Sequence, residues 1–265
     1  MERAFQAAAV PTGLRVYALF HFCFLGVLLL LTACGGQRQH SPKQTKPPAT
    51  IILWAWDRAE DLRFLHPGEA EVAALMETIY LRNGRAESWG RKLPLLLPDG
   101  MNPIPVIRLE SDGSELPSAD SVASLLWRWI ARSPRHLQTA SSQQIQIDFD
   151  ARSSQRTWYG ELIPLLRKWK PWISITALAS WCLENPWFSG VPDEAVPMLF
   201  QMGPRRNGIL DRLYRQGHFA DGCRDALGIS SAELLPWRPE AKRVYIFNPQ
   251  RWTREAFTRA CARLR

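Results

Sequence analysis

The segment Ile145-Gln146-Ile147-Asp148-Phe149-Asp150-Ala151 alternates apolar side chains with polar or acidic ones. In a β-strand such alternation produces one apolar face and one polar face. The apolar face carries Ile145, Ile147 and Phe149, and the polar face carries Gln146, Asp148 and Asp150. In a barrel, the apolar face packs on the surrounding helices and the polar face points inward. The segment therefore predicts a barrel strand with carboxylates on its inner face.

Short β-rich segments alternate with amphipathic helical patterns along the chain, which is the order of βα units around a parallel sheet. The expected strands are Ile51–Trp56, Ala74–Leu81, Pro105–Glu110, Gln144–Asp150, Trp172–Trp181, Ala195–Met202, Ala226–Ser230 and Arg243–Asn248. The expected helices are Ser118–Arg132, Ser153–Lys168, Pro204–Gln216 and Thr253–Arg263, with Ser118 and Thr253 suited to cap the first and the last of them.

This pattern predicts an α/β fold, a small (β/α)8 barrel of the TIM type, over residues 51–265. Only a loop fits between Trp181 and Ala195, so the barrel is expected to lack at least one helix. A doubly wound open sheet is the alternative, although no Gly-rich phosphate loop accompanies any of the strands.

The paired aspartates are candidates for catalysis. Asp150 lies at the carboxyl end of its expected strand, where barrel enzymes keep their reactive groups. Because Asp148 is two residues away, like-charge repulsion raises one of the two pKa values, as a proton donor at neutral pH requires. The alternative is structural: the aspartates cap the helix that follows at Ser153 and pair with arginines inside the barrel.

The strand Pro105–Glu110 repeats this alternation, which places Arg108 and Glu110 on the inner face. An arginine among carboxylates can hold one of them ionised and leave another protonated, or it can form a buried structural ion network. Glu110 is therefore a candidate catalytic carboxylate, and Arg108 a candidate substrate-binding group.

Four further residues are expected at the rim of the barrel because they lie at or just past strand ends: Asp57, Asn248, Trp56 and Trp181. The chain has 12 tryptophans, all after residue 50. Flat aromatic faces beside carboxylates are a common way to hold sugar rings. Trp56 and Trp181 are therefore candidate sugar-stacking residues, and Asp57 and Asn248 candidate polar contacts.

Five cysteines occur, of which Cys182, Cys223 and Cys261 follow residue 50. In an oxidising compartment one disulfide is possible, with Cys182–Cys223 the favoured pair. The histidines His40, His66, His136 and His218 are isolated, so we expect no metal site.

The first 33 residues are typical of a bacterial lipoprotein signal peptide. Arg3 and Arg15 precede the apolar run from Val16 to Leu31, which is shorter than the about 20 residues of a spanning helix. The run ends in Leu31-Thr32-Ala33-Cys34, a lipobox that makes Cys34 the expected lipidated N-terminus. An uncleaved N-terminal anchor is the alternative.

Residues 34–50 are polar and proline-rich, which predicts a flexible tether between the lipid and the barrel. Because Gly35 follows the cysteine in place of an inner-membrane retention aspartate, the expected location is the bacterial cell envelope, with the outer membrane favoured over the inner one. The formal net charge of +8 comes from scattered basic residues, and we expect no nucleic-acid partner outside the cytoplasm.

Five runs carry a family resemblance: LWAWDRAEDLRFL, QIDFDARSSQRTWY, ISITALASWC, DEAVPMLFQMG and KRVYIFNPQRW. Together, over residues 51–252, they resemble the bacterial domain-of-unknown-function family 3142, which implies a fold more than an activity. More distantly, Gln146-x-Asp148-x-Asp150 is similar to the Asp-x-Asp-x-Glu signature of chitinase-like glycoside hydrolases. It departs from that signature in Gln146 and in Asp150, which is one methylene shorter than glutamate.

Two hypotheses follow. In the first, the chain is an envelope glycoside hydrolase without a cofactor, with Asp150 as general acid, Asp148 beside it, and Glu110 or Asp57 as a second carboxylate. In the second, it is a non-catalytic carbohydrate-binding or structural lipoprotein.

Overall fold

The computed structural model describes residues 49–132, 144–168, 172–233, 235 and 237–264. The expected leader, Cys34 and most of the tether lie outside the described residues. The described residues belong to one compact unit.

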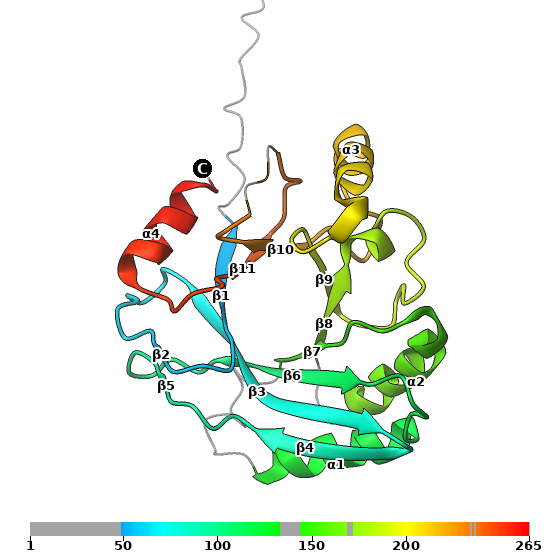
Figure 1. The fold of residues 1–265 in the computed structure, drawn as a ribbon. Helices are drawn as coiled ribbons and strands as arrows, with labels where there is room; N and C mark the ends of the chain where they lie inside the picture. The colour runs from blue at the N-terminus through cyan, green and yellow to red at the C-terminus, as the bar shows by residue number, and fades with distance from the viewer. Residues whose placement is uncertain (1–48, 133–143, 169–171, 234, 236, 265) are drawn as a thin grey trace, which may run out of the picture. The chain divides into compact units, whose positions relative to one another are not determined.

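Eight parallel strands close into a barrel (Figure 1), which confirms the predicted (β/α)8 architecture. Closure comes from β1, which pairs with β11 on one side and with β3 on the other. The barrel strands are β1 (Thr50–Ala55), β3 (Glu71–Arg82), β6 (Ile104–Ser111), β7 (Gln144–Asp148), β8 (Trp172–Leu178), β9 (Glu194–Met198), β10 (Ala226–Ser230) and β11 (Arg243–Phe247).

Four α-helices are described: α1 (Ala119–Arg132), α2 (Arg156–Arg167), α3 (Arg206–Gln216) and α4 (Arg254–Ala262). Within the residues that the structure covers, no α-helix follows β1, β3, β8 or β10, in agreement with the expectation that the barrel lacks at least one helix. Both expected caps form: the Ser118 hydroxyl accepts from the Ser121 N–H, and the Thr253 hydroxyl accepts from the Ala256 N–H.

A hairpin takes the place of the helix after β3. The strand β4 (Arg85–Gly90) pairs antiparallel with β3 through the two-residue turn Asn83-Gly84. Both turn residues have positive φ, 48° and 70°, which is the conformation that this tight hairpin requires and that Asn-Gly adopts readily. Two short strands, β2 (Glu60–Asp61) and β5 (Leu95–Leu96), form a separate small sheet.

Three strands end two or more residues before their predicted ends: β7 at Asp148, β8 at Leu178 and β9 at Met198. After β8 the chain enters a 3-10 turn, η4 (Ala179–Cys182), and after β9 it enters another, η5 (Gly203–Arg205). A third, η3 (Ser153–Gln155), precedes α2. Asp150 and Trp181 therefore lie in turns rather than in strands.

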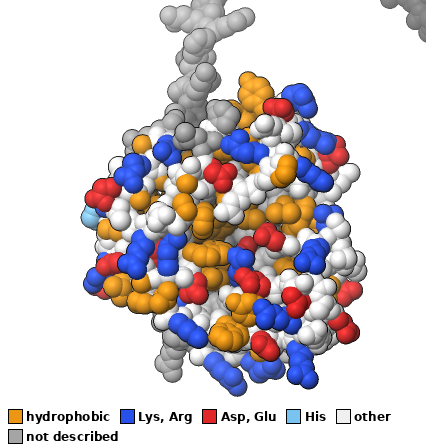
Figure 2. All heavy atoms as spheres, in the orientation of Figure 1, with side chains coloured by type: hydrophobic (Ala, Val, Ile, Leu, Met, Phe, Trp, Pro, Cys, Tyr) orange, Lys and Arg blue, Asp and Glu red, His pale blue; other side chains and the backbone are white. Residues whose placement is uncertain are grey.

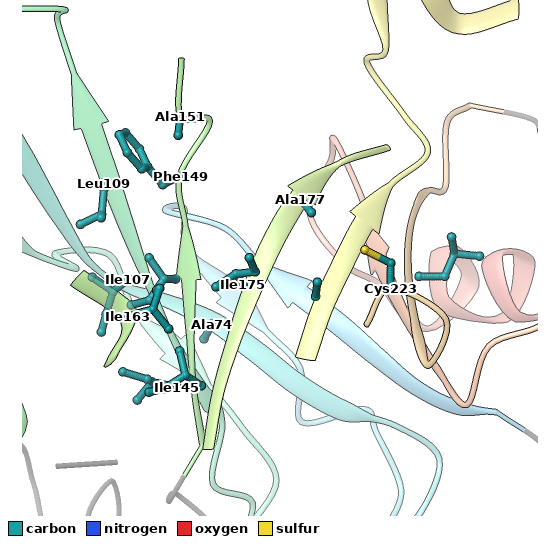
Figure 3. Packing of buried hydrophobic residues seen from close by; sticks show 14 of the residues in the cluster. Ala74, Ile107, Leu109, Ile145, Phe149, Ala151, Ile163, Ile175, Ala177 and Cys223 are labelled. Atoms are coloured by element: carbon teal, nitrogen blue, oxygen red, sulfur yellow. The ribbon is translucent and has the colours of Figure 1, made fainter. Parts of the chain in front are cut away.

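The predicted inside and outside of β7 are observed. Ile145, Ile147 and Phe149 belong to the apolar layer between barrel and helices (Figure 3), together with Ile163 of α2. A second, smaller apolar cluster fills the barrel interior, and it includes Ile52, Trp54, Val106 and Tyr245. The barrel strands, unlike the exposed β4, are thus largely buried on both faces, as a barrel requires.

Cys182 and Cys223 form the expected disulfide, with an S–S distance of 2.12 Å and both residues buried. The link spans 41 positions and encloses β9 and α3. A disulfide that closes a loop of this size lowers the conformational entropy of the unfolded chain. This effect typically stabilises a protein by about 2–4 kcal/mol.

We therefore expect the double variant Cys182→Ala, Cys223→Ala to lose about 2–4 kcal/mol in free energy of unfolding. Urea denaturation of the variant and of the oxidised protein measures the difference. Reduction of the unaltered protein with dithiothreitol is the control and should move its midpoint in the same direction. Coincident midpoints for the oxidised protein and the variant would show that the link does not stabilise the barrel.

Candidate functional site at the barrel mouth

A cavity of 510 Å³ opens at the carboxyl ends of the strands. Its wall combines aromatic, acidic and basic side chains, which gather at the centre of the face in Figure 2. Its lining includes Trp54, Trp56, Arg108, Asp148, Asp150, Thr176, Phe200, Arg205 and Phe247. The volume lies in the range of about 300–1,000 Å³ that small-molecule sites occupy.

Gln146 supports the floor of this cavity. Its Oε1 accepts a 2.7 Å hydrogen bond from the Trp54 indole, and its Nε2 donates to the Ser174 hydroxyl at 3.1 Å. An uncharged amide can both accept from one neighbour and donate to the other, which a carboxylate cannot do. The amide at this position therefore has a structural reason: it fixes the Trp54 ring beneath the mouth.

Asp148 lies one layer higher and is buried, with 8% of its surface exposed. Its Oδ1 accepts a 2.7 Å hydrogen bond from the Thr176 hydroxyl, and its Oδ2 is 3.6 Å from Arg108 Nη1. Burial raises the pKa of Asp148 to about 6, the Asp150 charge adds to the rise, and Thr176 and Arg108 oppose it. The carboxyl group therefore titrates near neutrality.

Asp150 lies past the end of β7 and lines the mouth. Its residue surface reaches solvent, but the concave wall surrounds the carboxylate with protein atoms. This partial desolvation raises the pKa of Asp150, and the Arg108 charge works against the rise. The two aspartates of the expected pair thus line one cavity in different environments, an arrangement that separates acid from base roles.

Arg108 connects the carboxylates on β6 and β7. Its Nε donates to Glu110 Oε1 at 2.6 Å, and its guanidinium lies 5.2 Å from the centre of the Trp56 ring. Glu110 does not line the mouth cavity; it lines a smaller neighbouring cavity of 270 Å³, which Arg108, Asp148 and Asp150 also border. Glu110 is therefore held as the partner of Arg108 rather than presented to the main cavity.

An aromatic wall stands in the same cavity. Trp56 meets Phe247 edge to face at 6.1 Å, and Phe247 stacks on Phe200 at 5.4 Å with an interplanar angle of 5°. The two phenylalanines were not among the expected site residues. Phe247 ends β11, so the rule that selected Trp56 would also have selected it.

Three expected rim residues lie outside the cavity. Trp181 is buried, 7% exposed, and packs on Trp187 at 5.4 Å in the layer outside the barrel, because the chain leaves β8 three residues before it. Asn248 is also buried; its side chain accepts from Ser231 and donates to the carbonyls of Gln250 and Arg251. Asp57 is exposed and does not border the cavity.

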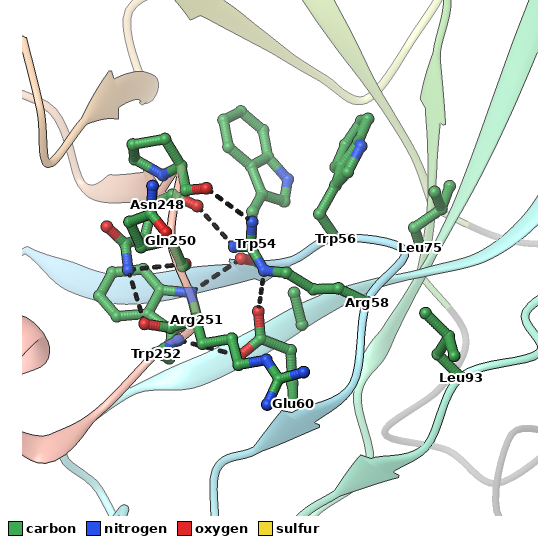
Figure 4. Close-up of polar contacts among 12 residues, drawn as sticks. Trp54, Trp56, Arg58, Glu60, Leu75, Leu93, Asn248, Gln250, Arg251 and Trp252 are labelled. Atoms are coloured by element: carbon green, nitrogen blue, oxygen red, sulfur yellow. Dashed lines mark hydrogen bonds and ion pairs between the residues drawn. The ribbon is translucent and has the colours of Figure 1, made fainter.

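Arg58 clamps the loops that follow β1 and β11 (Figure 4). Its guanidinium donates to Glu60 Oε1 at 2.5 Å and to the carbonyls of Asn248 and Pro249 at 2.5 and 3.0 Å. Glu60 also accepts from the Trp252 N–H at 2.9 Å. These bonds fix the chain next to Trp56 and Phe247, so the aromatic wall has a rigid support.

The opposite end of the barrel is closed by a polar network around Glu194. Glu194 is 5% exposed and accepts hydrogen bonds of 2.7 Å from both Ser174 and Tyr245, while Arg243 Nε lies 3.3 Å from its other oxygen. Arg243 also donates to Gln144 at 3.2 Å. The barrel interior below Gln146 is therefore filled by this polar network.

The raised pKa of Asp148 predicts a pH-dependent stability. The carboxyl group binds its proton more tightly in the folded state, so its contribution to stability is present below the ordinary pKa of 3.8 and is lost as the pH rises through about 6. Asp148→Asn should therefore raise the free energy of unfolding at pH 7 by about 1–3 kcal/mol and leave it unchanged below about pH 4. Urea denaturation at pH 3.5, 5 and 7 measures this. A gain of equal size at all three pH values would contradict it.

In the described part of the chain, no helix is long and apolar enough to cross a membrane, and no group of three or more His, Cys, Asp or Glu could hold a metal ion. The described unit is a (β/α)8-type barrel with an open, carboxylate-bearing cavity at the carboxyl end of its strands. No protein-family model matches the chain, and no curated protein matches it.

Proposed function

We propose that the barrel binds a polysaccharide at its mouth and hydrolyses a glycosidic bond there. The observation that carries the proposal is the pairing, in one cavity, of Asp148 and Asp150 with the aromatic wall of Trp56 and Phe247. Sugar rings present CH groups that pack on aromatic faces and hydroxyl groups that donate hydrogen bonds to carboxylates. Both the aromatic residues and the aspartates of the cavity can therefore contact a sugar.

In the proposed reaction, Asp150 donates its proton to the glycosidic oxygen as the bond from that oxygen to the anomeric carbon breaks. Water adds to the anomeric carbon and gives up a proton. Asp148, which borders the same cavity, is the carboxylate that accepts it. Glu110 has an indirect role in this reaction, since it holds Arg108 in place. Asp57 and Trp181 have no role in it.

A second candidate function is binding without hydrolysis. Arg108 lies between Glu110 and Asp148 as a structural ion network would require, and this observation favours it. Turnover separates the two candidates.

The test is incubation of the purified protein with a panel of soluble polysaccharides, with new reducing ends and retardation in affinity gels as readouts. Release of reducing ends from one member supports hydrolysis. Retardation without release supports the binding function, and neither response to any member removes both.

We also propose that the chain is an envelope lipoprotein anchored through Cys34. Two sequence features support this proposal: the apolar run Val16–Leu31 and the lipobox that ends it. In cells fed radiolabelled palmitate, the chain should take up label and the variant Cys34→Ala should take up none. Cys23→Ala is the control. Because Cys23 precedes the cleavage point, this variant should take up as much label as the unaltered chain. Label on Cys34→Ala would refute the anchor.

A further inference from the structure

Resting on the proposed function, we infer that the polysaccharide carries negatively charged groups, such as uronic-acid carboxylates or sulfate or phosphate esters, and that Arg205 binds them. The inference starts from the charges that border the mouth cavity. Asp148 and Asp150 face Arg108, which is itself paired with Glu110. The guanidinium of Arg108 is thus taken up by carboxylates of the protein itself.

Arg205 borders the same cavity and is different. It is exposed, and among the described residues its side chain has neither an ion pair nor a hydrogen bond. The other arginines nearest the mouth are committed: Arg108 to Glu110, and Arg58 to Glu60 and two carbonyls. Arg205 is the guanidinium at the cavity that has its donors available, and five donors in a planar fork suit a carboxylate, sulfate or phosphate.

The position of Arg205 in the chain is electrostatically unfavourable without such a ligand. It is the residue just before α3, whose first turn has no acidic residue, and its side chain caps no N–H group of that helix. A positive charge at a helix N-terminus is repelled by the helix dipole. Local rules are broken in this way mostly at functional sites, and a bound anion would offset the repulsion.

The segment that carries Arg205 is shaped to face the cavity. Gln201 and Gly203 have positive φ, 51° and 63°, and both border the cavity together with Met202. The backbone N–H of Gln201 donates a 2.9 Å hydrogen bond to Glu233 Oε1, and this bond fixes the turn. Arg205 therefore belongs to the wall of the cavity next to α3, while the carboxylates come from the end of β7 and the segment after it.

The test compares Arg205→Gln with the unaltered full-length protein, purified in detergent. Arg215→Gln is the matched control, because Arg215 is exposed on α3, the helix that follows Arg205, but does not border the cavity. The probes are pairs with one backbone and two charges: polygalacturonate and its methyl ester, and carboxymethyl and hydroxyethyl cellulose. A further probe, sodium glucuronate followed by calorimetry, reports on the anion site alone.

We expect the protein to prefer the charged member of a pair, and Arg205→Gln to lose roughly 10- to 100-fold in affinity for that member only. Arg215→Gln should keep the preference. Equal affinity for both members, or a preference that survives Arg205→Gln, overturns the inference while leaving the sugar function standing. If no polysaccharide binds but glucuronate binds through Arg205, the anion site stands and the proposed function fails; if glucuronate fails as well, both fall.

Discussion

Replacing Asp150 by Asn is expected to lower the rate of hydrolysis by about 10²–10⁴-fold. Asn has nearly the shape of Asp but has no acidic proton to give to the glycosidic oxygen. The residue borders an open cavity and lies beyond the strand end, so the substitution disturbs no described ion pair or hydrogen bond of its side chain. Binding of the same polysaccharide should persist, because the aromatic wall is intact.

The readout is the release of reducing ends at saturating polysaccharide, with affinity measured in parallel. Asp211→Asn is the control, since Asp211 is exposed on α3 and does not border the cavity. Turnover by Asp150→Asn that equals that of the control would exclude Asp150 as the general acid. Loss of binding together with turnover would assign Asp150 to substrate binding.

The largest loss of stability is expected from Glu194→Ala. Glu194 is buried at the closed end of the barrel, and its removal leaves Tyr245 and Ser174 without their acceptor and Arg243 without its buried carboxylate. Removing one partner of a buried ion pair costs about 3–5 kcal/mol, because the remaining charge is then buried without compensation. Against a total stability of about 5–15 kcal/mol, this is a large fraction.

Urea denaturation measures this loss, and Asp225→Ala is the control. Asp225 forms a 3.0 Å ion pair with Lys242, but both side chains are mostly exposed, and such pairs contribute about 1 kcal/mol or less. If Glu194→Ala does not fold, Glu194→Gln takes its place in the measurement. This variant retains one acceptor oxygen, so its loss of stability should lie between those of Glu194→Ala and Asp225→Ala. Equal midpoints for Glu194→Ala and Asp225→Ala would show that the network does not stabilise the barrel.

The barrel could be predicted because its strands are buried on both faces and alternate with helices. The segment Ile145–Ala151 indicated the correct inner and outer faces of β7, since side chains alternate strictly within a strand. The hairpin after β3 was not predicted, although the sequence contains a signal for it. Asn83-Gly84 is a typical two-residue hairpin turn, and it lies between two β-rich runs.

The site could be predicted only as far as the strands continue. Asp148 and Trp56 lie at or just beyond strand ends and border the cavity as expected. For Trp181 the period of two no longer applies, because it lies in the 3-10 turn η4, which keeps Ala179 and Ser180 at the mouth and places Trp181 against Trp187 in the outer layer. Arg205 had no signal in the strand pattern, since the turn that carries it depends on two residues with positive φ.

The central claim is that the mouth cavity holds a sugar chain between the aspartates and the aromatic wall. The most direct test is a crystal structure of Asp150→Asn with an oligosaccharide from the best-binding polysaccharide. We expect a sugar ring against Trp56 inside the cavity and a glycosidic oxygen within hydrogen-bond distance of residue 150. An oligosaccharide bound elsewhere on the protein, with the cavity free of sugar, would contradict the account.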